Sequence, residues 1–274
     1  MGIVEAAFFD LDKTVIAKAS IMAFARDFRH EGLLTRRTMA KGLWLQLVYV
    51  HLGAGSKKLT RIRQSVLSLT RGWDQSHVRQ VVGEKLSSAI DPITFCEAKQ
   101  LIDDHRQAGR MVYLVSAAPA EIVDPVAHHL GAHGAVASVA RVGEDGRYTG
   151  DLERYAYGQE KAAIIRRIAG RDGLDLAASF AYSDSATDLP MLEAVGHPVA
   201  VNPDRALRRI AQLRGWEILR FDRLLEPALV LEARATGRGG RILRGSAAAA
   251  VVAAAGGAGA VAWRYRSQWG FGHP

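Results

Sequence analysis

Short apolar segments alternate with amphipathic helical patterns along most of the chain, and this alternation constrains the fold more than any other feature. Each apolar segment is followed by small or polar residues; the segments are 4–9, 111–115, 179–182 and 199–201. Strands that alternate with helices pair in parallel, because each helix carries the chain back across the sheet. We therefore expect an α/β fold with a doubly wound, mainly parallel sheet. In such sheets ligands bind at the carboxyl ends of the strands.

One segment interrupts this alternation after the first strand. Its periodicity predicts three helices separated by Gly, Ser and Thr, at residues 21–30, 36–52 and 57–69. Such an insert is typical of a helical cap, which we place at residues 17–90 between core segments 1–16 and 91–222. Within it, residues 43–52 are apolar on nearly every face, which predicts a buried cap helix or a surface that touches a membrane.

A hairpin signal lies in residues 141–151. Asp145-Gly146 is flanked there by strand-like residues. This dipeptide favours the tight turns of β-hairpins, because these turns require positive φ. We therefore expect a hairpin centred on this pair.

The net charge of +8 is unevenly distributed. Residues 1–204 contain 24 basic and 24 acidic residues, whereas residues 205–274 contain 12 Arg and 4 acidic residues. This count assigns the whole basic surplus to the C-terminal tail, beside an apolar stretch. No aromatic residues of the kind that stack on bases are interleaved with it. We therefore expect a membrane surface, and not nucleic acid, as a partner of the tail.

Residues 246–263 form an uncharged run rich in Ala, Val and Gly. A helix of this length spans about 27 Å, close to the ~30 Å hydrocarbon core of a bilayer. We expect a transmembrane or membrane-associated helix here, after a basic linker at 223–245; a flexible Ala/Gly-rich tail is the alternative. More Arg precedes the run than follows it, which favours a cytoplasmic catalytic domain. The lone Cys96 and the absence of a signal-peptide pattern agree with a cytoplasmic location.

Carboxylates gather where the first strand is expected to end. Asp10 and Asp12 lie two residues apart in the segment FFDLDKT, and Thr14 follows them. Neighbouring carboxylates are costly unless a cation or a proton separates them. Oxygen-only ligands favour Mg²⁺, so the pattern predicts a magnesium site. An ordinary acidic turn is the alternative interpretation.

A second polar site follows the strand at 111–115. Ser116 comes next, and the backbone N–H groups of Ala117 and Ala118 are expected to enter a helix. A hydroxyl and free N–H groups at a helix start form a cradle for phosphate. A simple helix cap is the alternative for a single serine.

Further charged residues lie near a predicted helix start and after the strand at 179–182. Lys161 lies early in a helical pattern, and Asp184 and Asp188 follow the strand, four residues apart. Taken singly, a helical lysine is usually solvated. Two carboxylates at this spacing share one face only if the turn is helical.

Together and in this order, these residues resemble the four signature motifs of the haloacid dehalogenase (HAD) superfamily of phosphohydrolases. The first motif matches Asp10, Asp12 and Thr14, the second Ser116, the third Lys161, and the fourth Asp184 and Asp188. The resemblance covers about residues 4–222. The position of the cap is similar to that of subfamily IB, the phosphoserine-phosphatase-like branch.

The resemblance implies a Mg²⁺-dependent phosphomonoester hydrolase that works through an aspartyl-phosphate. Asp10 would be the nucleophile, and Asp12 the general acid and base. Phosphate would be bound by Ser116, Ala117 and Lys161. Mg²⁺ would be bound by Asp10, the backbone carbonyl of Asp12, and Asp184, with Thr14 and Asp188 in support.

The sequence departs from phosphoserine phosphatases at two cap positions. Residues 15–22 contain no acid where these enzymes bind the substrate amine, and Val66 stands near the position of their carboxylate-binding arginine. We therefore expect that phosphoserine is not the substrate and that a lipid-type or other small phosphomonoester is. Phosphoserine phosphatase activity is the alternative.

The fourth motif also departs from a common glycine-rich form. Ser183 and Ser185 replace glycines, and Thr187 replaces an asparagine. The carboxylates remain, so we expect metal binding to be retained. A receiver-like phosphoaspartate signalling module is an alternative of a different class, and Asp12 argues against it because storage of the phosphoryl group needs no acid/base residue.

Overall fold

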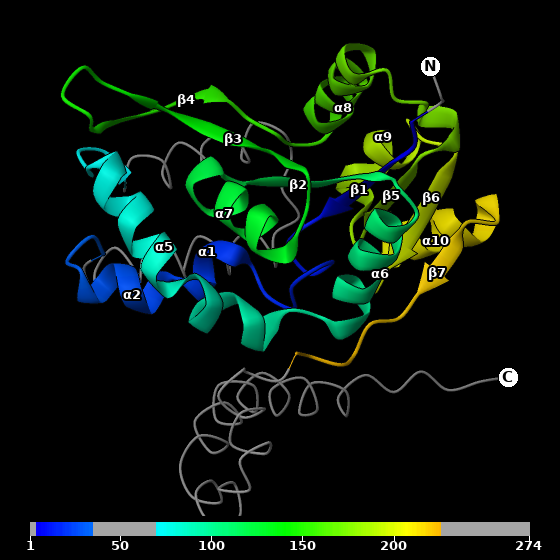
Figure 1. The fold of residues 1–274 in the computed structure, drawn as a ribbon, viewed down its shortest axis with the longest axis horizontal. Coiled ribbons are helices and arrows are strands. Elements are labelled where there is room, and N and C mark those ends of the chain that lie inside the picture. The colour runs from blue at the N-terminus through cyan, green and yellow to red at the C-terminus, as the bar shows by residue number, and fades with distance from the viewer. Residues whose placement is uncertain (1–3, 35–69, 226–274) are drawn as a thin grey trace, which may run out of the picture. The chain divides into compact units, whose positions relative to one another are not determined.

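A seven-stranded sheet forms the centre of the part of the chain that the computed structural model describes, residues 4–34 and 70–225 (Figure 1). The strand order is β4-β3-β2-β1-β5-β6-β7, and every neighbouring pair is parallel except the antiparallel pair β3–β4. This confirms the expected α/β fold. The strands are β1 (Ala6–Asp10), β2 (Met111–Pro119), β3 (Gly134–Val142), β4 (Tyr148–Arg154), β5 (Phe180–Ser183), β6 (His197–Val201) and β7 (Glu217–Leu219).

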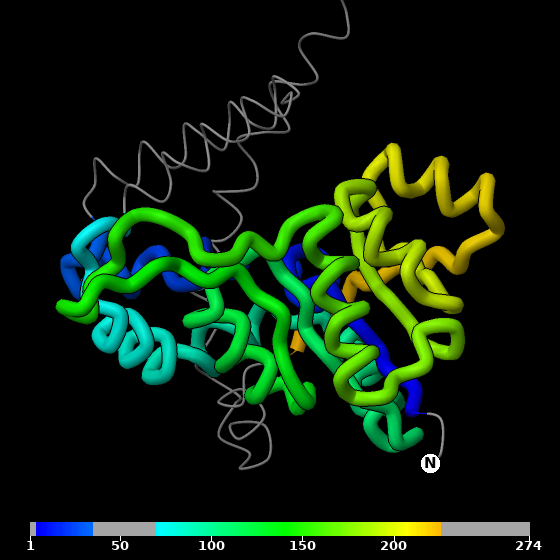
Figure 2. The backbone as a smooth tube through the Cα atoms, turned by 90° about the horizontal axis from the view of Figure 1, so that it is seen from above, coloured from blue at the N-terminus to red at the C-terminus, as the bar shows by residue number. Residues whose placement is uncertain are grey.

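Helices lie on both faces of this sheet (Figure 2). One hydrophobic cluster includes residues of α5 (Gln75–Ile90), α6 (Cys96–Gln107) and α7 (Ala120–Leu130). A second cluster includes residues of α8 (Gln159–Asp172), α9 (Leu189–Leu192) and α10 (Arg205–Arg214). The sheet is therefore covered on each side, as parallel sheets require.

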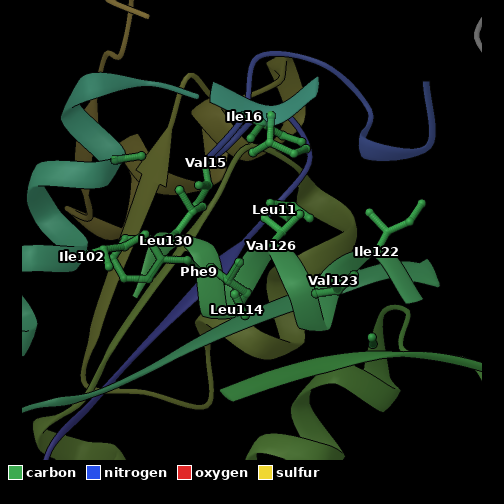
Figure 3. Packing of buried hydrophobic residues seen from close by; sticks show 14 of the residues in the cluster. Phe9, Leu11, Val15, Ile16, Ile102, Leu114, Ile122, Val123, Val126 and Leu130 are labelled. Carbon is green, nitrogen blue, oxygen red and sulfur yellow. The ribbon is translucent and has the colours of Figure 1, made fainter. Parts of the chain in front are cut away.

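The alternation of β1 explains why both faces are buried. Phe9 belongs to the first cluster with Leu114 of β2 and Ile102 of α6 (Figure 3). Phe8 points the other way and belongs to the second cluster, with Ile165 of α8. Successive side chains of a strand point to opposite faces, so a continuous apolar run is what a central strand needs.

The cap segment is described only at its two ends. The predicted helix at 21–30 is formed as two shorter helices, α1 (Ser20–Ala23) and α2 (Ala25–His30), with a break at Phe24. The helices predicted at 36–52 and 57–69, including the apolar run 43–52, lie outside the described residues. At the other end, Val78, Val81 and Val82 of α5 are buried in the first cluster. The cap boundaries at 17 and 90 stay a prediction.

The predicted hairpin is formed by β3 and β4. Gly146 adopts φ of 75° in the turn, as the Asp145-Gly146 pair predicts. The hairpin also holds the chain where it enters α5. The Gly72 N–H donates to the Tyr148 carbonyl (2.8 Å), and the Tyr148 N–H donates to the Trp73 carbonyl (3.0 Å).

The location of the basic surplus differs from the prediction. Residues 205–225 hold six Arg and two acidic residues, so half of the net +8 belongs to α10, β7 and the segment after them. The run 246–263 and the linker after Leu225 lie outside the described residues. Within residues 4–34 and 70–225, no helix is both long and apolar enough to cross a bilayer.

His105 of α6 is a buried group with consequences for stability. Its Nε2 lies 2.8 Å from the Tyr182 hydroxyl, and its ring packs edge-on against Phe9. Burial, assisted by the positive charge of Arg110, lowers the pKa of His105 from 6.5 to about 4. The unfolded chain therefore binds more protons than the folded chain between these two pH values, and the folded state loses stability as the pH falls through this window.

We expect His105 to remove about 2 kcal/mol of stability between pH 7 and pH 5. This contribution is measured against His105→Phe, which keeps an aromatic ring but cannot titrate. It is the change, from pH 7 to pH 5, in the difference between the urea-unfolding free energies of the two proteins. Carboxylates that titrate in the same window cancel in this difference. Parallel pH profiles for the two proteins would contradict the prediction.

Candidate active site

The parallel register brings three strand ends together. Asp10, the last residue of β1, pairs in register with Val115 of β2, and Phe9 pairs with Tyr182 of β5. Ser116 and Ser183 therefore flank Asp10 on its two sides. This is the carboxyl edge of the sheet, where ligands bind in open α/β folds.

A lysine from another element completes the centre of the site. Lys161 is the third residue of α8, and its Nζ donates to Asp10 Oδ1 at 2.5 Å and to Asp188 Oδ2 at 2.8 Å. All three side chains are nearly inaccessible, with residue exposures of 3%, 6% and 3% for Lys161, Asp10 and Asp188. The Thr14 hydroxyl lies 3.5 Å from Asp10 Oδ2. We call Asp10, Lys161 and Asp188 the ion triad.

Burial and pairing oppose each other in this triad. Burial raises the pKa of Asp10 well above 3.8, although Lys161 acts in the opposite direction. Burial acts to lower the pKa of Lys161, but Asp10 and Asp188 more than offset it, so its pKa is raised above 10.5. Lys161 is therefore a permanent cation in a site where a cation is needed to keep a carboxylate ionised.

Asp12 lies on a tight turn that leaves β1. Lys13 adopts φ of 65°, and the N–H groups of Val15 and Ile16 both donate to the Leu11 carbonyl at 3.0 Å. Asp12 Oδ1 accepts from the Ser20 N–H at 2.8 Å, which links it to the first residue of α1. Burial raises the pKa of Asp12. A raised pKa suits a carboxyl group that must give up a proton near neutral pH.

The predicted phosphate cradle is built differently from the expectation. The helix was expected to begin directly after Ser116, and this is wrong: β2 continues to Pro119, and α7 begins at Ala120. Proline disfavours the helical conformation in the residue before it, so Ala118 stays extended. The Ala118 N–H donates to Ser116 Oγ at 3.1 Å. Ser116, which is 1% exposed, directly follows Val115, the register partner of Asp10.

Serine hydroxyls hold the loop of the fourth motif, whereas the common form of this motif has glycines at the same positions. Ser183 Oγ donates to Asp188 Oδ2 at 2.8 Å and accepts from the Ser185 N–H at 3.3 Å. Ser185 caps the short 3₁₀ helix Ala186–Asp188 through the Thr187 N–H. Among the described non-glycine residues, only Lys13 and Asn202 have positive φ. The serines therefore fit without the backbone freedom of glycine.

Asp184 is a half-buried carboxylate at the start of the fourth-motif loop. No side chain within the described residues donates a hydrogen bond to its carboxyl group, while its backbone carbonyl accepts from the Asp204 N–H at 2.7 Å. Burial raises the pKa of Asp184 to about 6, and the charge of Asp188 adds to this effect, while Lys13 opposes it. A half-buried carboxylate of this kind is stabilised by a cation.

The donor set fits Mg²⁺ in its chemistry. Within residues 4–34 and 70–225, no three side chains of His, Cys, Asp or Glu lie close enough together to hold one metal ion. The ligands implied by the resemblance are two carboxylates, from Asp10 and Asp184, and a backbone carbonyl, from Asp12. All are oxygens, and Mg²⁺ typically takes one or two carboxylates and completes its shell with water and substrate phosphate.

The positioning roles of three residues were missed by the sequence analysis, which named Ser183 only as a replacement for glycine. Ser183 orients Asp188, the Ser20 N–H contacts Asp12, and Asp204 Oδ2 accepts from the Ala186 N–H at 3.1 Å. Ser183 carries a weak signal, because it directly follows a predicted strand. Ser20 and Asp204 carry none, because their contacts are 8 and 18 residues away in the sequence.

Comparisons with known proteins agree with this geometry. The family model "haloacid dehalogenase-like hydrolase" matches residues 7–193. A Streptomyces azureus protein named "Inhibition of morphological differentiation protein" is 50% identical over 218 residues, which cover 80% of this chain and 79% of that protein. Phosphoserine phosphatase SerB1 of Mycobacterium tuberculosis (strain H37Rv) is 35% identical over 218 residues, which cover 79% of this chain and 70% of SerB1.

A solved structure extends the likeness to the fold. The crystal structure of a Bordetella pertussis Tohama I protein with unknown function has a TM-score of 0.70 at 27% identity, and the match covers 80% of this chain and 99% of that one. The family model spans more than half of the chain. The chain therefore belongs to the haloacid dehalogenase-like hydrolases and is a phosphatase of the phosphoserine-phosphatase-like branch.

Proposed function

We propose that the protein hydrolyses phosphomonoesters through a phosphorylated Asp10, with Mg²⁺ as the cofactor. The observation that carries this proposal is the ion triad at the end of β1, where Lys161 Nζ bridges Asp10 and Asp188. It places a permanent cation against a carboxylate that would otherwise repel a dianionic phosphate. Asp12 lies two residues further along the same turn.

The reaction would proceed in two steps. Asp10 attacks the phosphorus atom, the ester P–O bond breaks, and Asp12 gives its proton to the departing alkoxide. A water molecule then gives a proton to Asp12 and attacks the same phosphorus, which breaks the bond to Asp10 and releases phosphate. Lys161, Ser116 and the Ala117 N–H would bind the phosphoryl oxygens throughout.

Mg²⁺ would be held by Asp10, the Asp12 carbonyl and Asp184, with Asp188 and Thr14 in support. When bound, it would neutralise charge on the phosphoryl group. We expect hydrolysis of p-nitrophenyl phosphate to fall to background after EDTA treatment and to return best with Mg²⁺. Full activity in EDTA would overturn the metal requirement.

For the substrate, we propose a lipid-type or other weakly polar phosphomonoester. The described part of the cap supports this, because residues 15–22 carry no acid and α1 exposes Ile21 and Met22, which are 40% and 46% accessible. α1 begins at Ser20, the residue that contacts Asp12. A polar zwitterion would find no charged partner on this helix.

Phosphoserine is therefore expected to be a poor substrate, at least about tenfold below lysophosphatidate in kcat/KM. A panel with Mg²⁺, containing both compounds and a sugar phosphate, decides this by phosphate release. The likeness to SerB1 makes phosphoserine the necessary comparison. If phosphoserine were the best substrate by an order of magnitude, the interpretation of the cap would be wrong.

We also propose that residues 246–263, with the arginines around them, attach the cytoplasmic catalytic domain to a membrane. The support is the sequence pattern alone: an uncharged run bracketed by Arg241, Arg244, Arg264 and Arg266. Fractionation of the full-length chain at low and high salt tests it. Release at high salt indicates adsorption, and recovery in the soluble fraction at both salt concentrations would exclude attachment.

A further inference from the structure

Helix α10 presents a basic face without acidic partners. Arg205, Arg208 and Arg209 occupy positions i, i+3 and i+4, so they lie on one side of the helix. All three are exposed, and none forms an ion pair with another described residue. The helix itself contains no acidic residue.

An apolar side chain continues this face. Leu213 lies one turn after Arg209 and is 77% exposed, the largest value among the exposed large hydrophobic residues of the described chain. Opposite it, Leu207 and Ala211 are fully buried in the second hydrophobic cluster. The helix is therefore fixed in rotation, and its basic and apolar outer side chains cannot turn inward.

The start of α10 is attached to the candidate active site. Asp204 caps the helix by accepting from the Leu207 N–H at 2.7 Å, and its other oxygen accepts from the Ala186 N–H at 3.1 Å. The Asp204 N–H donates to the Asp184 carbonyl. The basic face therefore begins next to the loop that carries Asp184 and Asp188.

We propose that the face formed by Arg205, Arg208, Arg209 and Leu213 docks on a bilayer surface that contains anionic lipids. Arginines would pair with lipid headgroups, and Leu213 would enter the boundary between headgroups and acyl chains. The remainder of the chain agrees with this partner, because residues 226–274 hold six Arg, two acidic residues and the uncharged run at 246–263. The docking needs no substrate, so it goes beyond the proposed phosphatase reaction.

A nucleic acid fits this face less well. Single-strand binding usually combines basic residues with free aromatic rings. The first aromatic residue after α10 in the sequence, Trp216, is covered by Arg214, whose guanidinium carbon lies 5.0 Å from the ring centroid. Arg214 is itself paired with Glu193. An exposed leucine, in contrast, can bury its side chain at the boundary between lipid headgroups and acyl chains.

Co-sedimentation of the full-length protein with vesicles tests the proposal. The test variant replaces Arg205, Arg208 and Arg209 with Gln. The matched control replaces Arg166, Arg167 and Arg171 of α8, which are also exposed, so both proteins lose three charges and keep similar helix propensity. Vesicles of phosphatidylcholine with about one third phosphatidylserine are compared with phosphatidylcholine alone in roughly 0.1 M salt, where charges interact only over about 10 Å.

The test variant is expected to bind the anionic vesicles at least about tenfold more weakly than wild type, and the control within about twofold. Leu213→Gln should weaken binding by roughly threefold at unchanged charge. Equal losses in the test and control variants would mean that only net charge matters and would overturn the proposal. Unchanged vesicle binding in the test variant would also overturn the proposal. So would a test variant that loses binding to tRNA, used as a nucleic-acid probe, but keeps its binding to vesicles.

Hydrolysis of p-nitrophenyl phosphate without vesicles reports folding and is expected to be unchanged in all three variants. If the triple variant loses this activity, Arg208→Gln and Leu213→Gln replace it, and normal vesicle binding in both would overturn the proposal. Sedimentation does not depend on turnover. A failure of the docking surface is therefore distinguishable from a failure of the phosphatase assignment.

Discussion

The Asp10→Asn variant is expected to lose turnover by more than about 10⁴-fold and to form no phosphoryl-enzyme. An amide oxygen is a poor nucleophile. The substitution also removes one of the two negative charges that hold Lys161 in place. The change keeps the size of the side chain, so the buried end of β1 should remain packed. Acid-quenched enzyme, digested and weighed by mass spectrometry, reports the phosphorylated peptide directly.

Asp12→Asn is the matched control, because it makes the same chemical change two residues away on the same turn. It should also stop turnover with an alkyl phosphate, since the leaving alkoxide would receive no proton. With p-nitrophenyl phosphate, whose leaving group needs little protonation, the phosphoryl-enzyme should still form and accumulate. If the phosphopeptide recovered from the wild-type enzyme did not contain Asp10, the nucleophile would be a different residue.

The parts of the fold and site that could be predicted depend on local patterns. The apolar run before Asp10 and the strand before Ser116 form strands that end at the same edge of the sheet, as their shared pattern predicts. Lys161 lies in the first turn of α8, as its helical pattern predicts. The glycine in Asp145-Gly146 adopts positive φ in the hairpin turn. Each of these features is decided by residues that are neighbours in sequence.

The features that could not be predicted depend on contacts between distant segments. Lys161 and Asp10 are 151 residues apart, so local patterns do not bring them together; only the resemblance to the HAD motifs placed them in one site, and the fold shows their direct contact. Asp204 contacts the loop at 184–186 from the start of α10, with α9 and β6 between them in the sequence. Pro119 keeps Ala118 extended and delays the start of α7 to Ala120. The prediction gave more weight to the usual start of a helix directly after the strand. The arginines of α10 were counted with the tail because charge alone does not show where a folded unit ends.

Lys161→Met is expected to be the most destabilising single change in the site. It leaves Asp10 and Asp188, exposed by 6% and 3%, without a cationic partner among the described residues. Removal of one partner from a buried ion pair costs about 3–5 kcal/mol, because the remaining charge stays buried. The Ser183 and Thr14 hydroxyls still contact the carboxylates, but they carry no charge.

The pH dependence of Lys161→Met identifies the cause of the loss. Without Lys161, the folded-state pKa of Asp10 rises further above its unfolded value, because burial is then not opposed by the positive charge of Lys161. A group with a raised folded-state pKa favours folding at low pH, and this contribution is lost as the pH rises through the folded-state pKa. The stability difference from wild type should therefore be largest at pH 8 and shrink toward pH 5. Titration of His105 occurs in both proteins and cancels in the difference.

Lys99→Met is the matched control for this prediction. Lys99 also pairs with a carboxylate at short range, through Asp103, but both side chains are 31% exposed. A surface pair of this kind contributes less than about 1 kcal/mol, so its loss should be small and nearly independent of pH. Urea unfolding in EDTA at pH 5 and pH 8 measures all three proteins without a bound metal. If Lys161→Met cost no more than Lys99→Met at pH 8, Lys161 would not be the cation that stabilises the buried pair Asp10 and Asp188.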